Sequence, residues 1–287
     1  MDRLGELFGV YKARTGRFFG LRVGGFALFA IALFALLLFV YAAFFAEGIR
    51  FDKDFRWIIK YVIAFLILLA SIGALIFYIS FKWKPQYFFE VHEKGVVIKR
   101  KSADVDLRFD EIEDVIPFVT AARDNLGFEV NNLLFRKNAG SEWFAINGFF
   151  KDHLDLIGGF LAQHTEQRGS AQVQEIEATG STPFKYVEKS ALRKSTFSAD
   201  SFIDPVGGYL KKYKIHKTLY LSNDQIKIDD KTIYLEDTDY LEIGGLTTDT
   251  IYIKDAKGKE KFSLPHAALF SPDIFIAILA NRIEFKE

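Results

Sequence analysis

The chain has 287 residues and a mass of 32.8 kDa, which leaves room for about two domains of roughly 150 residues each. Half of the residues are hydrophobic and 26% are charged, which excludes a disordered chain. The 37 basic and 37 acidic side chains give no net charge and so no sign of a nucleic-acid partner, and the lack of cysteine excludes disulfide frameworks, thiolate catalysis and cysteine-based metal sites.

The N-terminal segment, residues 1–22, carries an apolar stripe at helical spacing. Four apolar residues fall at positions i, i+3, i+4 and i+7, namely Leu4, Leu7, Phe8 and Tyr11. Basic residues cluster from Lys12 onward, which is typical of helices that lie in a membrane interface. We therefore expect residues 2–18 to form an interfacial amphipathic helix, with packing of the same stripe against a soluble domain as the alternative.

Two long uncharged runs follow, over residues 23–46 and 61–81. At about 1.5 Å of rise per residue they make helices of about 36 and 31 Å, which is enough to cross a hydrocarbon core of about 30 Å. We expect residues 23–81 to form a two-helix transmembrane hairpin, because the first run is too long for a cleaved signal peptide. Aromatic rings prefer the two membrane interfaces, so four residues are candidate interface anchors, namely Trp57, Tyr61, Tyr78 and Trp83.

The basic residues beside the runs predict an orientation. Five lysines and arginines precede the first run and six follow the second, against four in and beside the short loop between them. Because basic residues concentrate on the cytoplasmic side, we expect a multi-pass protein of the cell inner (plasma) membrane with both termini in the cytoplasm. Small residues recur four apart, which favours close packing of the hairpin, at Gly20 and Gly24, Ala42 and Ala46, and Ala70 and Ala74.

After Pro85 the apolar period changes to about two, which predicts strands. The expected strands cover residues 87–92, 96–101, 105–109, 132–136 and 143–146, and a helix is expected over residues 152–164. The same pattern returns near the C-terminus, because residues 107–116 match residues 233–242 and residues 133–146 match residues 251–264. A helix over residues 272–282 again closes the copy. The soluble part therefore reads as two copies of one supersecondary unit.

This order of short strands, a turn with glycine, an acidic step, an apolar hairpin and a closing helix resembles bacterial pleckstrin-homology-like (PH-like) domains of the YcxB-like kind, which often follow two transmembrane helices. The resemblance covers residues 85–168 and 218–287. It implies an α+β soluble part made of two tandem curled antiparallel sheets, each closed by a C-terminal helix. Between them, the composition of residues 169–217 predicts a linker, with a short helix over residues 184–192.

The sequence carries no pattern of catalytic or cofactor-binding residues. The five histidines lack metal-ligand spacing, and no phosphate-binding glycine loop or serine-hydrolase elbow is present. Four acidic residues at one strand start are more typical of a solvated surface than of a cation site, namely Asp110, Glu111, Glu113 and Asp114. We therefore predict that the chain is not an enzyme and has no catalytic, cofactor or metal site.

Two basic clusters are candidates for contact with membrane lipids, since each lysine or arginine near an anionic leaflet contributes about 1 kcal/mol. They consist of Lys99, Arg100 and Lys101, and of Lys211, Lys212, Lys214 and Lys217. A solvated charged face is the alternative interpretation.

The leading hypothesis is a membrane-anchored, non-catalytic adaptor or regulator that binds a partner protein through tandem PH-like domains. An anionic-lipid-sensing module and an immunity protein that neutralises a membrane-acting toxin are the alternatives. The expected partners are membrane lipids and a protein, with a homo-oligomer left open and no nucleic acid.

Overall fold

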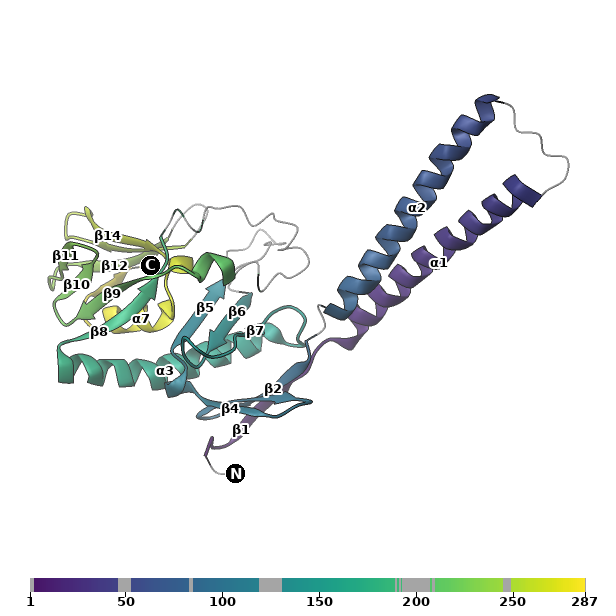
Figure 1. Ribbon diagram of the computed structural model, residues 1–287. Coiled ribbons are helices and arrows are strands. Elements are labelled where there is room, and N and C mark those ends of the chain that lie inside the picture. Colours follow the sequence, from purple (N-terminus) through teal and green to yellow (C-terminus); the bar gives the residue numbers. More distant parts are fainter. Residues whose placement is uncertain are drawn as a thin grey trace. The chain divides into compact units, whose positions relative to one another are not determined.

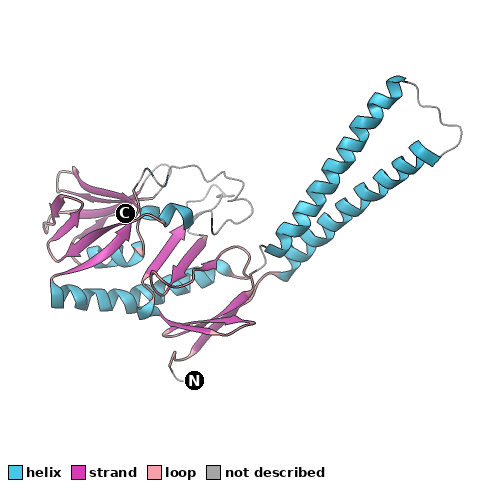
Figure 2. Ribbon diagram, viewed as in Figure 1, coloured by secondary structure: helices cyan, strands magenta, loops and turns pink. Residues whose placement is uncertain are grey.

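The computed structural model describes residues 3–45, 53–82, 85–118, 131–188, 190, 192, 207, 210–244 and 249–286. The chain divides into two compact units, which consist of Ala13–Pro85 and of Met1–Lys12 with Gln86–Glu287. The first unit is helical and the second is rich in strands (Figures 1 and 2).

The helical unit contains α1 (Thr15–Phe45) and α2 (Lys53–Lys82). Within them, Phe19–Tyr41 and Lys60–Lys82 are long and apolar enough to cross a membrane, judged by length and composition. The two helices run close together near the start of α1 and the end of α2 and diverge toward their other ends (Figure 1).

Two glycines allow this close approach of α1 and α2. A Cβ atom added to Gly25 would lie 2.8 Å from the backbone nitrogen of Phe77, and one added to Gly73 would lie 2.6 Å from that of Phe29. Gly20 and Gly24, at which small-residue packing is expected from spacing, have open space around them. The close contact between the helices therefore forms at Gly25, next to Gly24, and not at the expected pair of Gly20 and Gly24.

The interfacial helix expected over residues 2–18 is wrong over residues 7–11, and a helix begins only at Thr15. Leu7–Tyr11 is a strand, β1, that pairs antiparallel with β2 (Tyr87–His92), with Tyr11 opposite Phe89. Glycines at positions 5 and 9 weaken a helix here, and Gly5 has a φ of +75°. The edge of β2 supplies the hydrogen bonds that a helix would have made for itself, so tertiary pairing overrides the apolar spacing.

The first module of the strand-rich unit consists of two sheets and a long helix. Its four-stranded sheet has the order β1-β2-β3-β4 and its three-stranded sheet the order β5-β6-β7. The further elements are β3 (Gly95–Arg100), β4 (Val105–Arg108), η1 (Phe109–Glu111), β5 (Asp114–Phe118), β6 (Asn132–Arg136), β7 (Phe144–Ile146) and α3 (His153–Thr179). The expected strands of this copy are thereby confirmed.

The second module repeats this order. Its first sheet runs β11-β10-β9-β8 and its second runs β14-β13-β12-β15. The elements are β8 (Ser181–Tyr186), η2 (Lys211–Tyr213), β9 (Lys217–Ser222), β10 (Gln225–Ile228), β11 (Lys231–Tyr234), β12 (Tyr240–Gly244), β13 (Thr250–Lys254), β14 (Glu260–Pro265), η3 (His266–Ala268), α7 (Pro272–Ala280) and β15 (Glu284–Lys286). No sheet in the described ranges closes on itself.

Strand register confirms that the two copies correspond. In the first module Phe135 pairs with Phe144, and in the second Ile253 pairs with Phe262, as the match of residues 133–146 with residues 251–264 requires. The correspondence also makes β1 the counterpart of β8. The helical unit is therefore inserted between the first and second strands of the first module, at the point where residues 187–216 interrupt the second.

The linker expected over residues 169–217 is wrong in its first part, because α3 continues to Thr179 and β8 follows at once. Gly169 is buried in α3, and a Cβ atom added to it would lie 3.7 Å from Ile274 of α7. Gly169 thus lies where α3 packs against α7, while Gly180, at φ 88°, ends the helix in the left-handed region. The short helix expected over residues 184–192 is also wrong where it overlaps β8.

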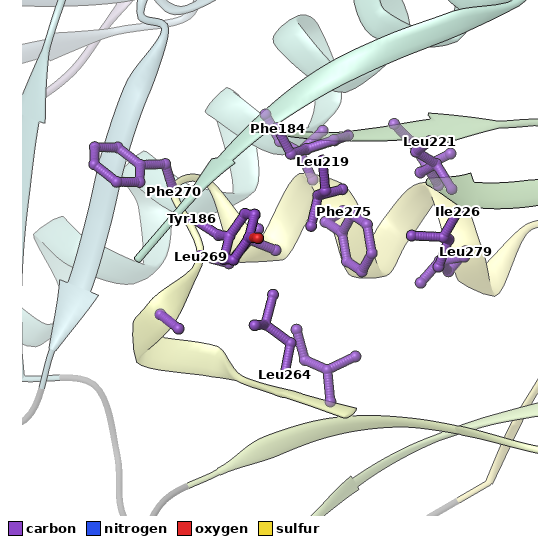
Figure 3. Close-up of a cluster of buried hydrophobic side chains, with 14 of the residues drawn as sticks. Phe184, Tyr186, Leu219, Leu221, Ile226, Leu264, Leu269, Phe270, Phe275 and Leu279 are labelled. Carbon is purple, nitrogen blue, oxygen red and sulfur yellow. The ribbon is translucent and has the colours of Figure 1, made fainter. Parts of the chain in front are cut away.

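The strand-rich unit has two hydrophobic cores, and α3 reaches both; the core of the second module also contains Ile116 and Leu134 of the first module's three-stranded sheet. Leu156, Ile157 and Phe160 of α3 belong to the core of the first module, whereas Ile176 belongs to that of the second. Figure 3 shows the second core, in which Phe184 of β8 lies against Phe275 of α7, with ring centroids 5.1 Å apart. A helix that reaches both cores makes the two modules one folding unit.

Candidate functional site

The two modules meet along the edge of β5, the first strand of the first module's three-stranded sheet. The backbone nitrogen of Ser271 donates a 2.6 Å hydrogen bond to the carbonyl oxygen of Val115 on this strand. Ser271 is 5% exposed and has a φ of 51°, a conformation that non-glycine residues adopt rarely. Because the second module seals this edge, a partner strand has no access to it.

Asp114 is the charged centre of this seam. It is 1% exposed, and Arg136 of β6 and Lys185 of β8 donate to its two carboxylate oxygens at 2.6 and 2.7 Å. A buried carboxylate needs such compensation because burial removes its hydration. Asp114 therefore holds the two modules together.

The other three residues of the predicted acidic cluster are also paired with basic groups. Asp110 pairs with Arg108 at 2.7 Å, and Glu111 pairs with Lys137 at 3.1 Å. Glu113 lies 3.8 Å from Lys185. In the described ranges no three histidine or carboxylate side chains are grouped so that they could hold a metal ion.

The first predicted basic cluster is largely neutralised. Lys99 pairs with Asp104 at 2.9 Å, and the hydrogen bond raises the pKa of Lys99. Arg100 pairs with Glu142 at 2.6 Å and also lies over the ring of Phe144. Lys101 alone of the three is exposed, so the cluster does not form a uniform positive surface.

The second predicted basic cluster is divided by its contacts. Lys217 pairs with Glu188 at 2.7 Å and with Asp229 at 3.2 Å, and the hydrogen bond that it donates to Glu188 is the main cause of its raised pKa. Lys212 is half-buried and donates to the carbonyl oxygen of Leu192, and burial lowers its pKa. Two further lysines of the cluster, Lys211 and Lys214, are exposed.

An exposed apolar residue lies beside these two lysines and was missed by sequence reasoning. Ile215 is 86% exposed, the highest value among the large hydrophobic residues of the described ranges. It directly follows Lys214, so a cationic and an apolar side chain share one exposed turn. The signal in the sequence was only a single isoleucine among lysines.

The predicted interface anchors are only partly described. Tyr61 and Tyr78 lie on α2 and are 60% and 52% exposed. Trp57 also belongs to α2, but its side chain lies outside the described set, as does the whole of Trp83.

Burial lowers the pKa of two of the five histidines, His164 and His266. His164 is 1% exposed, and its Nε2 donates to the carbonyl oxygen of Ile112 at 3.0 Å. Burial lowers the pKa of His164 to about 4, so the ring is neutral at pH 7. Burial also lowers the pKa of His266 and raises that of Asp273 close to it.

An open cavity of about 410 Å³ lies in the second module between the β10–β11 turn and β14. Two of its charged lining residues, Lys261 and Asp229, are engaged in ion pairs. Lys261 pairs with Asp239 at 2.7 Å and with Glu236 at 3.4 Å, and Asp229 pairs with Lys217. Charges that neutralise one another in this way favour a structural role for the cavity wall over a binding role.

The edge of β12 is the counterpart of the sealed β5 edge, and sequence reasoning did not identify it. It is covered by β15, a three-residue strand that pairs with it in parallel. All three residues of β15 are exposed, including Phe285 at 42%. This edge is therefore covered by a much smaller element than the β5 edge.

Comparison with models of known protein families and with curated proteins finds no match for this chain. The resemblance to YcxB-like PH-like proteins accordingly stays a prediction from the sequence pattern.

Proposed function

We propose that the chain is a membrane-anchored, non-catalytic adaptor that binds a partner protein through two PH-like modules. One observation carries the proposal: the order of a four-stranded sheet, a second sheet and a helix occurs twice, with three strands in the second sheet of the first module and four in that of the second. The buried carboxylates Asp114 and Asp239 are both neutralised by basic partners within the fold. A duplicated scaffold of this kind offers strand edges and loops to a partner.

The membrane anchor is part of this proposal. The pairing of β1 with β2 connects both ends of the helical hairpin to one sheet. If both helices cross the bilayer, residues 3–12 and 86–286 must lie on the same side. The distribution of lysine and arginine favours the cytoplasm of a bacterial cell for that side.

Crosslinking in native membranes tests the adaptor function. A photoreactive amino acid replaces Thr232 on β11, an exposed edge-strand residue, and a matched variant carries it at Leu219, which is fully buried. We expect one defined protein to be captured at Thr232 and not at Leu219. The purified protein should then bind the full chain in lipid nanodiscs. Capture of lipid alone, or no binding by the purified protein, contradicts the adaptor function.

Contact with anionic lipid is a second candidate function, favoured by the exposed turn that contains Lys214 and Ile215. The chain has no cysteine, so an environment-sensitive dye can be placed on Ile215→Cys, with Tyr234→Cys, 63% exposed, as the control. We expect a blue shift for the first position in nanodiscs with about one-third anionic lipid, lost at high salt because screening weakens the attraction. Equal spectra in neutral and anionic nanodiscs contradict lipid contact.

A further inference from the structure

The edge of β12 is covered by a single short strand. On one side β13 pairs with all five residues from Tyr240 to Gly244. On the other side β15 pairs in parallel with Tyr240, Leu241 and Glu242. An extended segment of a partner can form the same kind of backbone pairing with this edge.

The covering strand is also weakly held. The β12–β15 pair is parallel, whereas the other strand pairs of the described modules are antiparallel, and parallel pairing is somewhat less stable per residue. Three exposed residues bury little surface. Displacement of β15 therefore costs far less than opening the β5 edge, where Asp114 and Ser271 are buried.

The contacts of β15 show which chemistry fits the site. Phe285 is aligned with Leu241, which is fully buried, and Glu284 is aligned with Tyr240. The Lys286 ammonium lies 4.0 Å from the centroid of the Tyr240 ring, a distance at which a cation is attracted to the face of the ring. The edge thus suits an extended segment in which an aromatic residue is followed by a basic one.

We propose that the β12 edge is a docking site for an extended segment of a partner protein that presents an aromatic residue followed by a basic residue, and that residues 284–286 occupy it as a displaceable stand-in. This inference rests on the proposed adaptor function and names the strand through which it acts. The partner strand pairs with β12 from Tyr240 to Gly244, places its aromatic side chain beside Leu241 and sets its cation over the Tyr240 ring.

A peptide that copies the stand-in tests the site without any knowledge of the partner. The full chain and a variant that ends at Ile283 are placed in lipid nanodiscs. Each is titrated with a fluorescent peptide of residues 281–287, and binding is followed by anisotropy. We expect saturable binding to the shortened chain and at least tenfold weaker binding to the full chain, because the attached strand competes at a high effective concentration.

Two controls locate the binding. A peptide in which serine replaces the phenylalanine keeps the charge and should bind at least tenfold more weakly. The Tyr240→Ala substitution in the shortened chain removes the ring under the cation and should weaken binding several-fold. Equal binding to the shortened and full chains, or equal binding of the serine peptide, overturns the proposal.

Two further measurements distinguish a failure to fold from a failure to dock, and a failure of the docking site from a failure of the adaptor function. If the shortened chain loses its thermal transition, the full-length Phe285→Ser variant replaces it and should bind the peptide more tightly than the unaltered chain; no gain overturns the proposal. A partner captured at Thr232 together with no peptide binding removes the docking site and leaves the adaptor function. Peptide binding with no captured partner supports the site and contradicts the adaptor function.

Discussion

Lys185 and Asp114 form an ion pair across the seam between the two modules, with Lys185 Nζ 2.7 Å from Asp114 Oδ1. Lys185 lies on the first strand of the second module, and Asp114 begins the three-stranded sheet of the first. Arg136 contacts the same carboxylate at 2.6 Å and lies over the ring of Trp143. Two cations therefore depend on one buried anion for compensation.

Removal of that anion is expected to destabilise the whole strand-rich unit. Asp114→Ala leaves Arg136 and Lys185 without their common partner, and loss of one member of a buried ion pair costs about 3–5 kcal/mol. Thermal unfolding followed by circular dichroism, with the chain in nanodiscs, measures the effect. Glu142→Ala is the matched control, because Glu142 is more than half exposed and such pairs contribute about 1 kcal/mol or less. Equal transitions for the two variants would show that the seam does not depend on Asp114.

Local patterns predicted much of the fold. The strands over residues 87–92 and 132–136 follow from alternation between turn residues, and the repeat follows from matched apolar positions. The two apolar runs predicted the helices of the first unit for the same reason. In each case the information that decides the structure lies within about a dozen neighbouring residues.

Where distant residues decide the outcome, the sequence was insufficient. The stripe that contains Leu7 and Tyr11 has helical spacing, but its backbone pairs with a strand some eighty residues later. The sequence predicts a linker at Gly169, but in the structure this residue lies within α3, close to Ile274 of α7. Likewise, the sequence places Lys217 in a basic cluster, and only the fold brings the acidic side chains of Glu188 and Asp229 to it.

Packing of the helical hairpin should depend on Gly73. Replacement by leucine places a side chain where the backbone of Phe29 lies, so the helices must separate, whereas Gly24→Leu meets open space. Cysteines introduced at Phe26 and Phe77, whose rings are 6.3 Å apart, report the separation through the yield of a short bifunctional crosslinker. We expect a loss of most of the crosslinked product with Gly73→Leu and little change with Gly24→Leu. Equal yields for the two leucine variants would contradict close packing at Gly73.

The β1–β2 pairing predicts that both ends of the hairpin lie on one side of the membrane. Because the chain has no cysteine, single substitutions Glu6→Cys and Lys94→Cys each give a unique label site, and Gly48→Cys marks the loop between the helices. A membrane-impermeant maleimide added to sealed vesicles should label positions 6 and 94 to the same extent. Position 48 should be labelled when positions 6 and 94 are protected, and protected when they are labelled. Different labelling of positions 6 and 94 would mean that the two helices do not both cross.

His164 should make the strand-rich unit sensitive to acid. Its pKa is lowered to about 4 by burial, below the value of about 6.5 of an unfolded histidine. Between these values the unfolded chain binds the proton and the folded chain does not, so stability is complete above about pH 6.5 and falls as the pH decreases. The loss from this group reaches about 2 kcal/mol at pH 5.

A glutamine at position 164 isolates this contribution. Its side-chain amide can donate to the carbonyl oxygen of Ile112, as the imidazole Nε2 does, but it does not titrate. The midpoint of thermal unfolding, measured from pH 7.5 to pH 5, should therefore fall less steeply in His164→Gln than in the unaltered chain, even though His266, whose pKa burial also lowers, titrates in both. Because Arg168 near the ring disfavours a second positive charge, Arg168→Gln should reduce the slope as well. Parallel curves for the unaltered chain and His164→Gln would place the acid sensitivity elsewhere.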